Sequence, residues 1–312
     1  MSNTKWTANH IPNLTHKVAI VTGGNSGLGY ESVLAMAAKG AEVIMASRNL
    51  EKGQKAVDQI KNIHPEAKVT LMKLDLSDLE SVKTFAKAFQ TDYSRLDILL
   101  NNAGIMAVPE GRTVDGFERQ FGTNHLGHFA LTGLLLDLLH QTPESRVVNV
   151  ASKAADSGTF DFDNLNREGS YSPFGAYGQS KLANVLFTFE LQRKLQAANS
   201  STVSIAAHPG GSNTNLADGA KINPIIRSIL TPIFGLIAQS AAQGALPQLY
   251  ASTAPEAKGG TYYGPDGFNE LRGFPKEANI PSQALNRDWQ RQLWEASEKL
   301  TGVTYQSLEP TS

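Results

Sequence analysis

The chain has 312 residues, of which 41% are hydrophobic and 18% are charged. This length and balance predict a packed protein of one large or two ordinary domains, and they argue against disorder. With 28 basic and 29 acidic residues, the net charge of -1 gives no overall field for nucleic acid or an anionic membrane. The absence of cysteine excludes disulfides, thiolate-bound zinc and a cysteine nucleophile, and it is typical of a reducing compartment.

No targeting or membrane-spanning segment stands out. Residues 1–16 are mostly polar, without the apolar run of a secretory signal. The most apolar later stretch, residues 225–238, contains Arg227 and Pro232 and is shorter than the roughly 20 residues that span a bilayer. We therefore expect a cytoplasmic protein without a membrane span, with loose tails at 1–16 and 304–312.

Short β-branched runs alternate with longer segments of helical period. The predicted strands are Val18–Val21, Glu42–Ala46, Val69–Lys73, Leu96–Leu100, Arg146–Val150 and Val203–Ala207. The predicted helices between the first strands are Leu28–Lys39, Leu50–Asn62 and Asp78–Asp92. Nearly continuous apolar strands indicate a parallel sheet that is covered on both faces. The expected fold is a single-domain α/β Rossmann-type, doubly wound parallel sheet over residues 17–303.

A glycine-rich turn follows the first predicted strand and precedes a helix. It reads Thr22, Gly23, Gly24, Asn25, Ser26, Gly27, Leu28, Gly29. Glycines allow close backbone approach, and a helix N-terminus offers free N–H groups to a pyrophosphate. The turn therefore predicts a dinucleotide site that includes Thr22, Gly23, Asn25, Ser26, Gly27, Leu28 and Gly29. The spacing differs from the commonest fingerprint, and the alternative is a purely structural turn.

The residues that end the second strand bear on the choice of cofactor. NAD enzymes usually carry an acidic residue here that binds the ribose 2′-hydroxyl, whereas this chain has Ser47 followed by Arg48. A guanidinium can bind a 2′-phosphate, which a carboxylate would repel. This pattern favours NADP (NADPH) over NAD. The alternative is that Arg48 is only a solvated residue before a helix.

Tyr177 and Lys181 lie four residues apart in a segment that predicts a helix as far as Leu191, so they share one face. A lysine beside a tyrosine is expected to lower the pKa of the phenol, which could then exchange a proton near neutral pH. Ser152 follows the fifth strand, and Asn101 to Gly104 follow the fourth. Both segments are therefore expected at the carboxyl edge of the sheet, where ligands bind.

Together these motifs resemble the short-chain dehydrogenase/reductase family. The matching residues occur in the family's order over roughly residues 17–215: Thr22 to Gly29, Asp75-Leu76, Asn101 to Gly104, Asn124, Ser152, Tyr177 with Lys181, and Pro209-Gly210. Segments 262–267 and 293–300 resemble the branch that holds retinol dehydrogenases and protochlorophyllide reductases. The long interval from Ser152 to Tyr177, with its loop at 153–175, fits that branch.

The resemblance implies a role for each residue. Tyr177 would be the acid/base, Ser152 would bind the substrate oxygen, and Lys181 would hold the nicotinamide ribose. Asn124 would hold a water in a proton relay. The remaining cofactor contacts would come from Asp75, Leu76, Asn102, Ala103 and Gly104, and, at the carboxamide of the nicotinamide, from Pro209, Gly210, Ser212 and Thr214. It also suggests a homodimer or homotetramer through the helices that carry Asn124 and Tyr177, an arrangement that varies within the branch.

Three other features have simpler interpretations. His125 and His128 have a spacing that could present two imidazoles to a metal, but with no third ligand evident we expect them to pack or form hydrogen bonds. No metal site is predicted. Trp289 and Trp294 are interpreted as core residues. The segment at about 213–240 occupies the place of the family's substrate lid, although its apolar residues could equally form core or a partner-binding face.

The sequence thus predicts an NADP-dependent oxidoreductase. It would transfer a hydride between the nicotinamide and a carbonyl or alcohol carbon of a small-molecule substrate that is hydrophobic and of fair size. Two alternatives remain: a protochlorophyllide reductase-like enzyme, against which the absence of cysteine speaks, and a non-catalytic NADP-binding regulator. A regulator would have little use for the phenol of Tyr177.

Overall fold

The computed structural model describes residues 5–169, 171–211 and 239–308. Its centre is one eight-stranded sheet in the order β3-β2-β1-β4-β5-β6-β7-β8. All neighbouring strands pair in parallel except β7 and β8, which pair antiparallel. The strands are β1 (Val18–Thr22), β2 (Glu42–Ser47), β3 (Lys68–Lys73), β4 (Ile98–Asn101), β5 (Arg146–Val150), β6 (Val203–Ala207), β7 (Tyr262–Pro265) and β8 (Pro275–Glu277).

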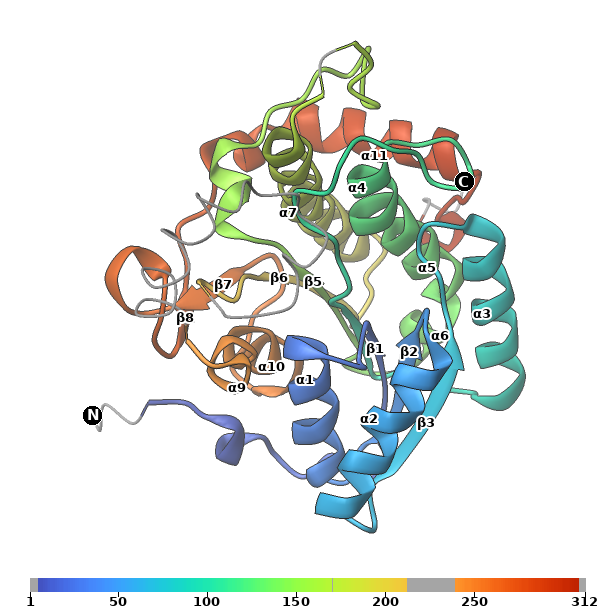
Figure 1. The fold of residues 1–312 in the computed structure, drawn as a ribbon, viewed down its shortest axis with the longest axis vertical. Coiled ribbons are helices and arrows are strands. Elements are labelled where there is room, and N and C mark those ends of the chain that lie inside the picture. The colour runs from blue at the N-terminus through green and yellow to red at the C-terminus, as the bar shows by residue number, and fades with distance from the viewer. Residues whose placement is uncertain (1–4, 170, 212–238, 309–312) are drawn as a thin grey trace.

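Helices cover both faces of this sheet (Figure 1). One face carries α1 (Gly27–Ala38), α2 (Leu50–Ile63), α9 (Ala241–Gly244) and α10 (Leu246–Thr253). The other carries α3 (Leu79–Asp92), α4 (Arg119–Phe121), α5 (Gly127–Leu134), α6 (Leu136–Gln141), α7 (Pro173–Ala197) and α11 (Arg287–Thr301). The predicted doubly wound α/β fold is therefore confirmed. The six predicted strands and three predicted helices are all present, with ends that shift by at most two residues.

The central strands are buried on both sides because successive side chains alternate between two cores. Ile20, Ile44 and Leu99 pack with α3, α5 and α7, whereas Val21 and Met45 pack with α1 and α2. Each of these five side chains is fully buried. This burial explains why the strands are apolar at nearly every position rather than at every second one.

The described parts of both tails are packed, and the expectation of loose tails was wrong there. In the first tail, Ile11 and Leu14 are buried against the α1 side of the sheet, and the Leu14 N–H donates to the Lys39 carbonyl at 2.8 Å. In the last, Tyr305 and Leu308 join the core, and the Tyr305 hydroxyl donates to the Phe129 carbonyl at 2.7 Å. These apolar residues are too widely spaced to give a periodic signal.

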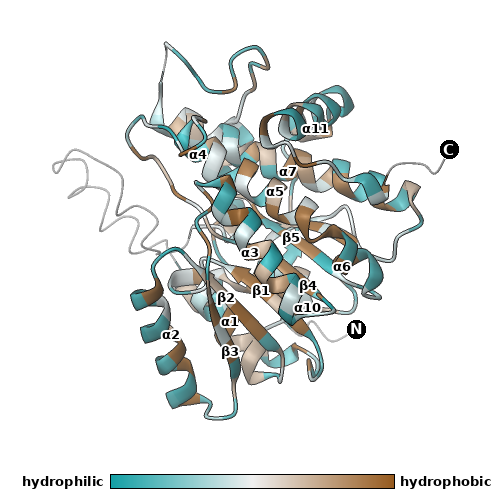
Figure 2. Ribbon diagram, turned by 90° about the vertical axis from the view of Figure 1, so that its right-hand side faces the viewer, coloured by the Kyte–Doolittle hydropathy of each residue, from teal (hydrophilic) through white to brown (hydrophobic). Residues whose placement is uncertain are grey.

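Helix α7 is enclosed on all sides by its own chain. From Ala176 to Gln192 every residue except Phe189 is buried. The sheet covers one side, and α11 covers the opposite side, where the rings of Trp294 and Phe187 lie 5.9 Å apart. Figure 2 shows α11 as largely hydrophilic and next to α7, away from the apolar strands, which is consistent with a helix at the outside of the molecule. In the described residues, no helix is both long and apolar enough to cross a membrane.

Candidate active site

The predicted site residues meet at one edge of the sheet because β1, β2, β4, β5 and β6 are parallel. Their carboxyl ends are Thr22, Ser47, Asn101, Val150 and Ala207. The chain turns into helices or loops directly after each of them. The strand order reverses between β1 and β4, and such a switch point is where open α/β sheets bind ligands.

The glycine-rich turn between β1 and α1 has the shape of a phosphate cradle. Gly23 has a φ of +65°, a left-handed backbone conformation that residues with side chains rarely adopt. A Cβ added at Gly29 would lie 2.3 Å from the Gly23 carbonyl oxygen, so a side chain there would clash. The N-cap residue Ser26 places no side-chain hydrogen bond on the first turn of α1, which leaves N–H groups to face a ligand. These features fit the pyrophosphate of a dinucleotide.

Hydrogen bonds of Thr22 connect this turn to the residues that follow β4. Its hydroxyl accepts hydrogen bonds from the backbone N–H groups of Asn102 and Ala103, both at 2.9 Å. The Asn102 side-chain amide in turn donates to the Thr22 carbonyl at 2.8 Å, and its Oδ1 accepts from Gln248 at 3.0 Å. The Asn102 side chain therefore holds the site together through bonds inside the protein, a role that the sequence did not reveal.

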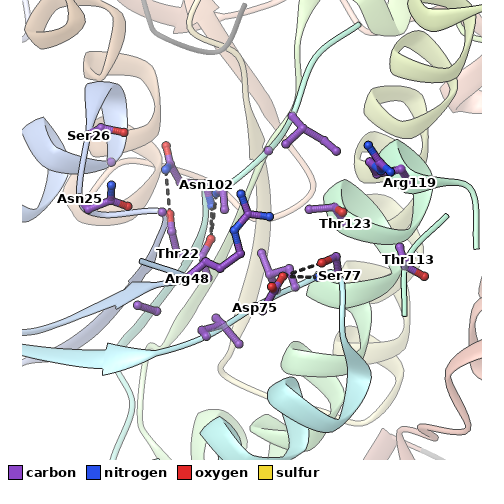
Figure 3. A pocket seen from close by; sticks show the side chains of 18 of the residues that line it. Thr22, Asn25, Ser26, Arg48, Asp75, Ser77, Asn102, Thr113, Arg119 and Thr123 are labelled. Carbon is purple, nitrogen blue, oxygen red and sulfur yellow. Dashed lines mark hydrogen bonds between the residues drawn. The ribbon is translucent and has the colours of Figure 1, made fainter. Parts of the chain in front are cut away.

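A pocket of about 680 Å³ runs along this edge (Figure 3). Among the predicted cofactor residues it is lined by Thr22, Gly23, Asn25, Ser26, Gly27, Leu28, Gly29, Arg48, Asp75, Leu76, Asn102, Ala103 and Gly104. Figure 3 shows the Arg48 side chain reaching into the pocket between Asn102 and Asp75. Arg48 is exposed, and no carboxylate in the described part of the chain forms an ion pair with it.

Ser47 and Asp75 are held by protein partners. Ser47 is buried behind the turn, where its hydroxyl donates to Asn25 Oδ1 at 3.0 Å and is also within 3.1 Å of the Asn49 carbonyl. It thus supports the loop and does not line the pocket, although sequence reasoning grouped it with the cofactor contacts. The Asp75 carboxylate accepts the N–H and hydroxyl of Ser77, at 3.0 and 2.6 Å, and still lines the pocket wall.

Tyr177 lies in the first turns of α7. The helix begins at Pro173, a residue suited to the first helical position, and the Ser172 side chain caps it by accepting from the Gly175 N–H. The Tyr177 side chain is 5% exposed. Burial raises the pKa of Tyr177 to about 12. Ser152 has the opposite, smaller effect on this pKa. The phenol is therefore protonated at neutral pH, with the predicted substrate-binding serine near enough to affect its pKa.

Lys181 lies one turn further along α7. Its ammonium group donates to the Val150 carbonyl at 2.9 Å and lies 5.8 Å from the centre of the Tyr177 ring. Burial lowers the pKa of Lys181 to about 8. Burial of the phenol dominates the pKa of Tyr177 in this structure, and Ser152 is the group that opposes it. The expected lowering of that pKa by Lys181 stays a prediction.

Asn124 lies in a π-helical turn, Gly122–Leu126, between α4 and α5. Turns of this kind often mark functional sites. Its side chain accepts from the Ile105 N–H at 2.8 Å and donates to the Ile105 carbonyl and to Ser180 Oγ, both at 2.9 Å. A Cβ added at Gly104 would lie 3.3 Å from both Asn124 Oδ1 and Lys181 Nζ, so the pocket edge at Gly104 adjoins two of the predicted catalytic residues.

The remaining predicted contacts follow β6. Pro209 and Gly210 are partly exposed at the same edge of the sheet, and Gly210 has a φ of +67°. Ser212, Thr214 and all but the last two residues of the expected lid, 213–240, lie outside the described residues. The loop from 153 to 172 contains a 3₁₀ turn at Lys153–Ser157 and is attached to α11 through stacked Phe160 and Phe162 rings against Trp289.

The histidines and tryptophans have the simpler roles that we expected. His125 and His128 are buried, and burial lowers the pKa of His125 to about 3 and of His128 to about 4, so both are neutral. His125 is within 2.8 Å of Ser297 Oγ. Trp294 is buried in the core against Phe129, whereas Trp289 is only half-buried and packs against Phe160. No cluster suited to a metal ion occurs among the described residues.

Comparison with known proteins agrees with this geometry. The family model for short chain dehydrogenases matches residues 17–223. The chain therefore belongs to the short-chain dehydrogenase/reductase family of nicotinamide-dependent oxidoreductases, as its motifs suggested.

Within that family the chain is similar to the retinol dehydrogenases. It is 37% identical to human retinol dehydrogenase 14, over 94% of this chain and 88% of that protein, and 40% identical to human retinol dehydrogenase 13, over 94% and 86%. A crystal structure of an uncharacterised protein from Mycobacterium paratuberculosis is 41% identical, with a TM-score of 0.81 over 97% of this chain and 99% of that one. The resemblance to the retinol dehydrogenase branch is confirmed.

Proposed function

We propose that the protein is an NADP-dependent alcohol and carbonyl oxidoreductase that acts on a hydrophobic substrate, with Tyr177 as its acid/base. The observation that carries the proposal is the buried phenol of Tyr177, whose ring centre lies 5.8 Å from the Lys181 ammonium group one helical turn away, beside a pocket suited to a dinucleotide. A protein that only bound the dinucleotide would not need a buried phenol at this place.

The glycine-rich turn, Arg48 and Lys181 would hold the dinucleotide, which would supply the hydride for reduction of a substrate carbonyl. Ser152 Oγ and the Tyr177 hydroxyl bind the carbonyl oxygen and hold it in place. As the carbon–oxygen double bond becomes single, Tyr177 transfers its proton to that oxygen, which gives the alcohol. The raised pKa of Tyr177 keeps the proton on the phenol until negative charge develops on the substrate oxygen. Lys181 is expected to hold the ribose and, as a cation, to stabilise the phenolate that remains.

The preference for NADP rests on Arg48. Its side chain lines the pocket where the second strand ends, while no carboxylate stands at Ser47 to bind a ribose 2′-hydroxyl. A guanidinium that reaches into the pocket from an exposed position can bind a 2′-phosphate through two parallel hydrogen bonds.

The proposed substrate class is a long apolar alcohol or its aldehyde. Relatives named retinol dehydrogenase, at 37% and 40% identity over nearly the whole chain, support this choice. The test is a panel of apolar and polar alcohols and carbonyls, each assayed with NADP(H) and NAD(H). We expect turnover of apolar members, retinol and retinal among them, with NADP(H) preferred. Tight NADPH binding without turnover of any member would instead favour the regulator.

A further inference from the structure

A buried carboxylate, Glu270, lies outside the motifs of the family and joins two parts of the active site. It belongs to a 3₁₀ turn, Phe268–Glu270, in the connection between β7 and β8. Its side chain is 4% exposed. One oxygen, Oε1, accepts from both the backbone N–H and the side-chain amide of Asn279, each at 2.8 Å. These bonds fix the carboxylate in one orientation.

The other oxygen, Oε2, faces the ends of two neighbouring strands. It lies 3.2 Å from the Lys153 ammonium group and 3.4 Å from His208 Nε2. Lys153 directly follows Ser152, and His208 directly precedes Pro209 and Gly210. A single carboxylate oxygen therefore contacts the residue next to the substrate-binding serine and the residue next to the predicted nicotinamide-binding segment.

Backbone contacts from the same turn support the second of these segments. The Gly211 N–H donates to the Leu271 carbonyl at 2.8 Å. A Cβ added at Gly210 would lie 2.5 Å from the Leu271 carbonyl oxygen and 2.8 Å from that of Glu270, so only glycine allows this approach. On the β5 side, the Tyr262 hydroxyl donates to the Ser152 carbonyl at 3.4 Å.

The turn adopts an unfavourable backbone conformation to make these contacts. Asn269 and Glu270 have φ values of +48° and +58°, in the left-handed region that residues with side chains rarely occupy. Such conformations persist where the surrounding contacts hold them, and they concentrate at functional sites. The ion pair to Lys153, the Asn279 bonds and the contacts to Gly210 and Gly211 are the interactions that hold this one.

We propose that Glu270 is a positioning residue, which sets Ser152 against the substrate oxygen and the Pro209–Gly211 segment against the nicotinamide. It touches neither substrate nor cofactor in this proposal and acts only through Lys153, His208 and the Leu271 carbonyl. The proposal rests on the proposed oxidoreductase function, and it assigns to the β7–β8 connection a part in catalysis that the family motifs do not include.

The test compares Glu270→Gln with wild type. The amide keeps an oxygen for Asn279 but loses the charge that faces Lys153, and it presents N–H donors to Lys153 and His208. We expect kcat to fall by about 10- to 100-fold, since a displacement of about 1 Å at a reacting group can have that effect. Affinity for NADPH should fall, while affinity for 2′,5′-ADP, which lacks the nicotinamide half, should not change. A change that only destabilised the protein would weaken the binding of NADPH and of 2′,5′-ADP to the same extent.

The matched control is Glu277→Gln on β8. Glu277 is an exposed glutamate in the same hairpin, whose carboxylate lies 3.8 Å from Lys258. The Glu277→Gln variant should match wild type in kcat, in affinity for NADPH and in affinity for 2′,5′-ADP. If Glu270→Gln does not fold, Lys153→Gln is the second variant. It removes one partner of Glu270, together with the 2.7 Å ion pair between Lys153 and Asp156, and it leaves the Asn279 bonds and His208 in place. It should lower kcat in the same way. The proposal is overturned if kcat is unchanged in a folded variant, or if NADPH and 2′,5′-ADP weaken equally.

The design separates this proposal from the cofactor assignment. If wild type prefers NADH, the proposed preference for NADP is wrong, but the role of Glu270 can still be tested. The binding comparison is then made with NADH and ADP. Weakened binding of NADH with unchanged binding of ADP in Glu270→Gln would still support the positioning role. Equal weakening of both would overturn it.

Discussion

His128 connects the glycine-rich turn to the helix that carries Asn124: its Nε2 lies 2.9 Å from Thr22 Oγ1, and its Nδ1 lies 2.9 Å from the Asn124 carbonyl oxygen. A carbonyl only accepts, so Nδ1 carries the proton of the neutral ring. Nε2 is then the acceptor, and the Thr22 hydroxyl donates to it while accepting from Asn102 and Ala103. One imidazole thus fixes the relative position of the glycine-rich turn and the π-helical turn that carries Asn124.

Replacing His128 with Leu should destabilise the protein and loosen the cofactor site. The change leaves the Thr22 hydroxyl and the Asn124 carbonyl without this partner, and each buried group so affected costs about 1–3 kcal/mol. Urea unfolding should show the loss in free energy of unfolding, and cofactor titration should show weaker binding. Thr22→Ser, which keeps the hydroxyl, is the control and should lose much less. Wild-type stability and affinity in His128→Leu would show that the contact contributes nothing.

The sequence predicted the strands, the glycine-rich turn and the catalytic helix because each depends on residues close together in the chain. It predicted that His128 packs or forms hydrogen bonds, but its partner Thr22 is 106 residues away and no local pattern points to it. The same holds for Asn102 with Gln248, which lie 146 residues apart. β7 and β8 were missed because they have four and three residues, and β7 contains Gly264 and Pro265. Glu270 gave no signal, since its neighbours in space come from three separate segments, at Lys153, at 208–211 and at Asn279.

Replacing Tyr177 with Phe should abolish turnover and leave cofactor binding nearly intact. The ring and its packing remain, and only the hydroxyl near Ser152 is lost. Loss of a general acid costs roughly 100- to 10,000-fold in kcat. The measurements are kcat on any accepted substrate and NADPH titration by fluorescence. Lys181→Ala is the informative companion, because it should weaken both turnover and binding if the lysine holds the ribose. Near-normal turnover of Tyr177→Phe would show that Tyr177 is not the acid/base.

Replacing Arg48 with Ala should weaken NADPH and leave NADH almost unaffected, because only NADPH has a 2′-phosphate. A hydrogen bond to a charged group contributes about 1.5–3 kcal/mol, which is roughly 10- to 150-fold in affinity. The NADPH preference of wild type should also shrink as salt rises, since Arg48 is exposed. Dissociation constants for both cofactors decide the matter, and equal weakening would mean that the phosphate is bound elsewhere. Ser47→Asp is a poor partner for this test, because it would remove the Asn25 hydrogen bond from a buried position.

The Glu270 carboxylate should make the protein sensitive to acid. Burial acts to raise its pKa, but hydrogen bonds from His208, Asn279 and Lys153 prevail and lower it to about 2, from an ordinary value of 4.5. Because the folded pKa is the lower one, the stabilisation is complete above about pH 4.5 and is lost as pH falls towards 2. A difference of this size corresponds to about 3 kcal/mol. Unfolding free energies of wild type and Glu270→Gln should therefore converge between pH 4.5 and 2. Curves that stay parallel would contradict the prediction.

The family resemblance suggested a dimer or tetramer through the helices that carry Asn124 and Tyr177. The enclosure of α7 predicts instead that the protein does not associate through these helices. A second copy would have to replace α11, whose Ser297 hydroxyl lies 2.8 Å from His125 and whose Trp294 ring packs 5.3 Å from Phe129. Lys194 also lies over the Trp294 ring, 4.8 Å from its centre, so the outer side of α7 is occupied as far as its last turns.

Wild type should therefore give no cross-link between Lys194 of one copy and Lys194 of another, whatever its mass in sedimentation. Deleting residues 287–312 should uncover the apolar side of α7 and produce dimers or larger aggregates, since exposed apolar patches of this kind associate. Arg291→Glu is the control, because this exposed residue of α11 forms ion pairs only within its own helix in the described structure, and its change should leave the mass unaltered. A Lys194–Lys194 cross-link in wild type would show that α11 moves aside and that the family's interface is used after all.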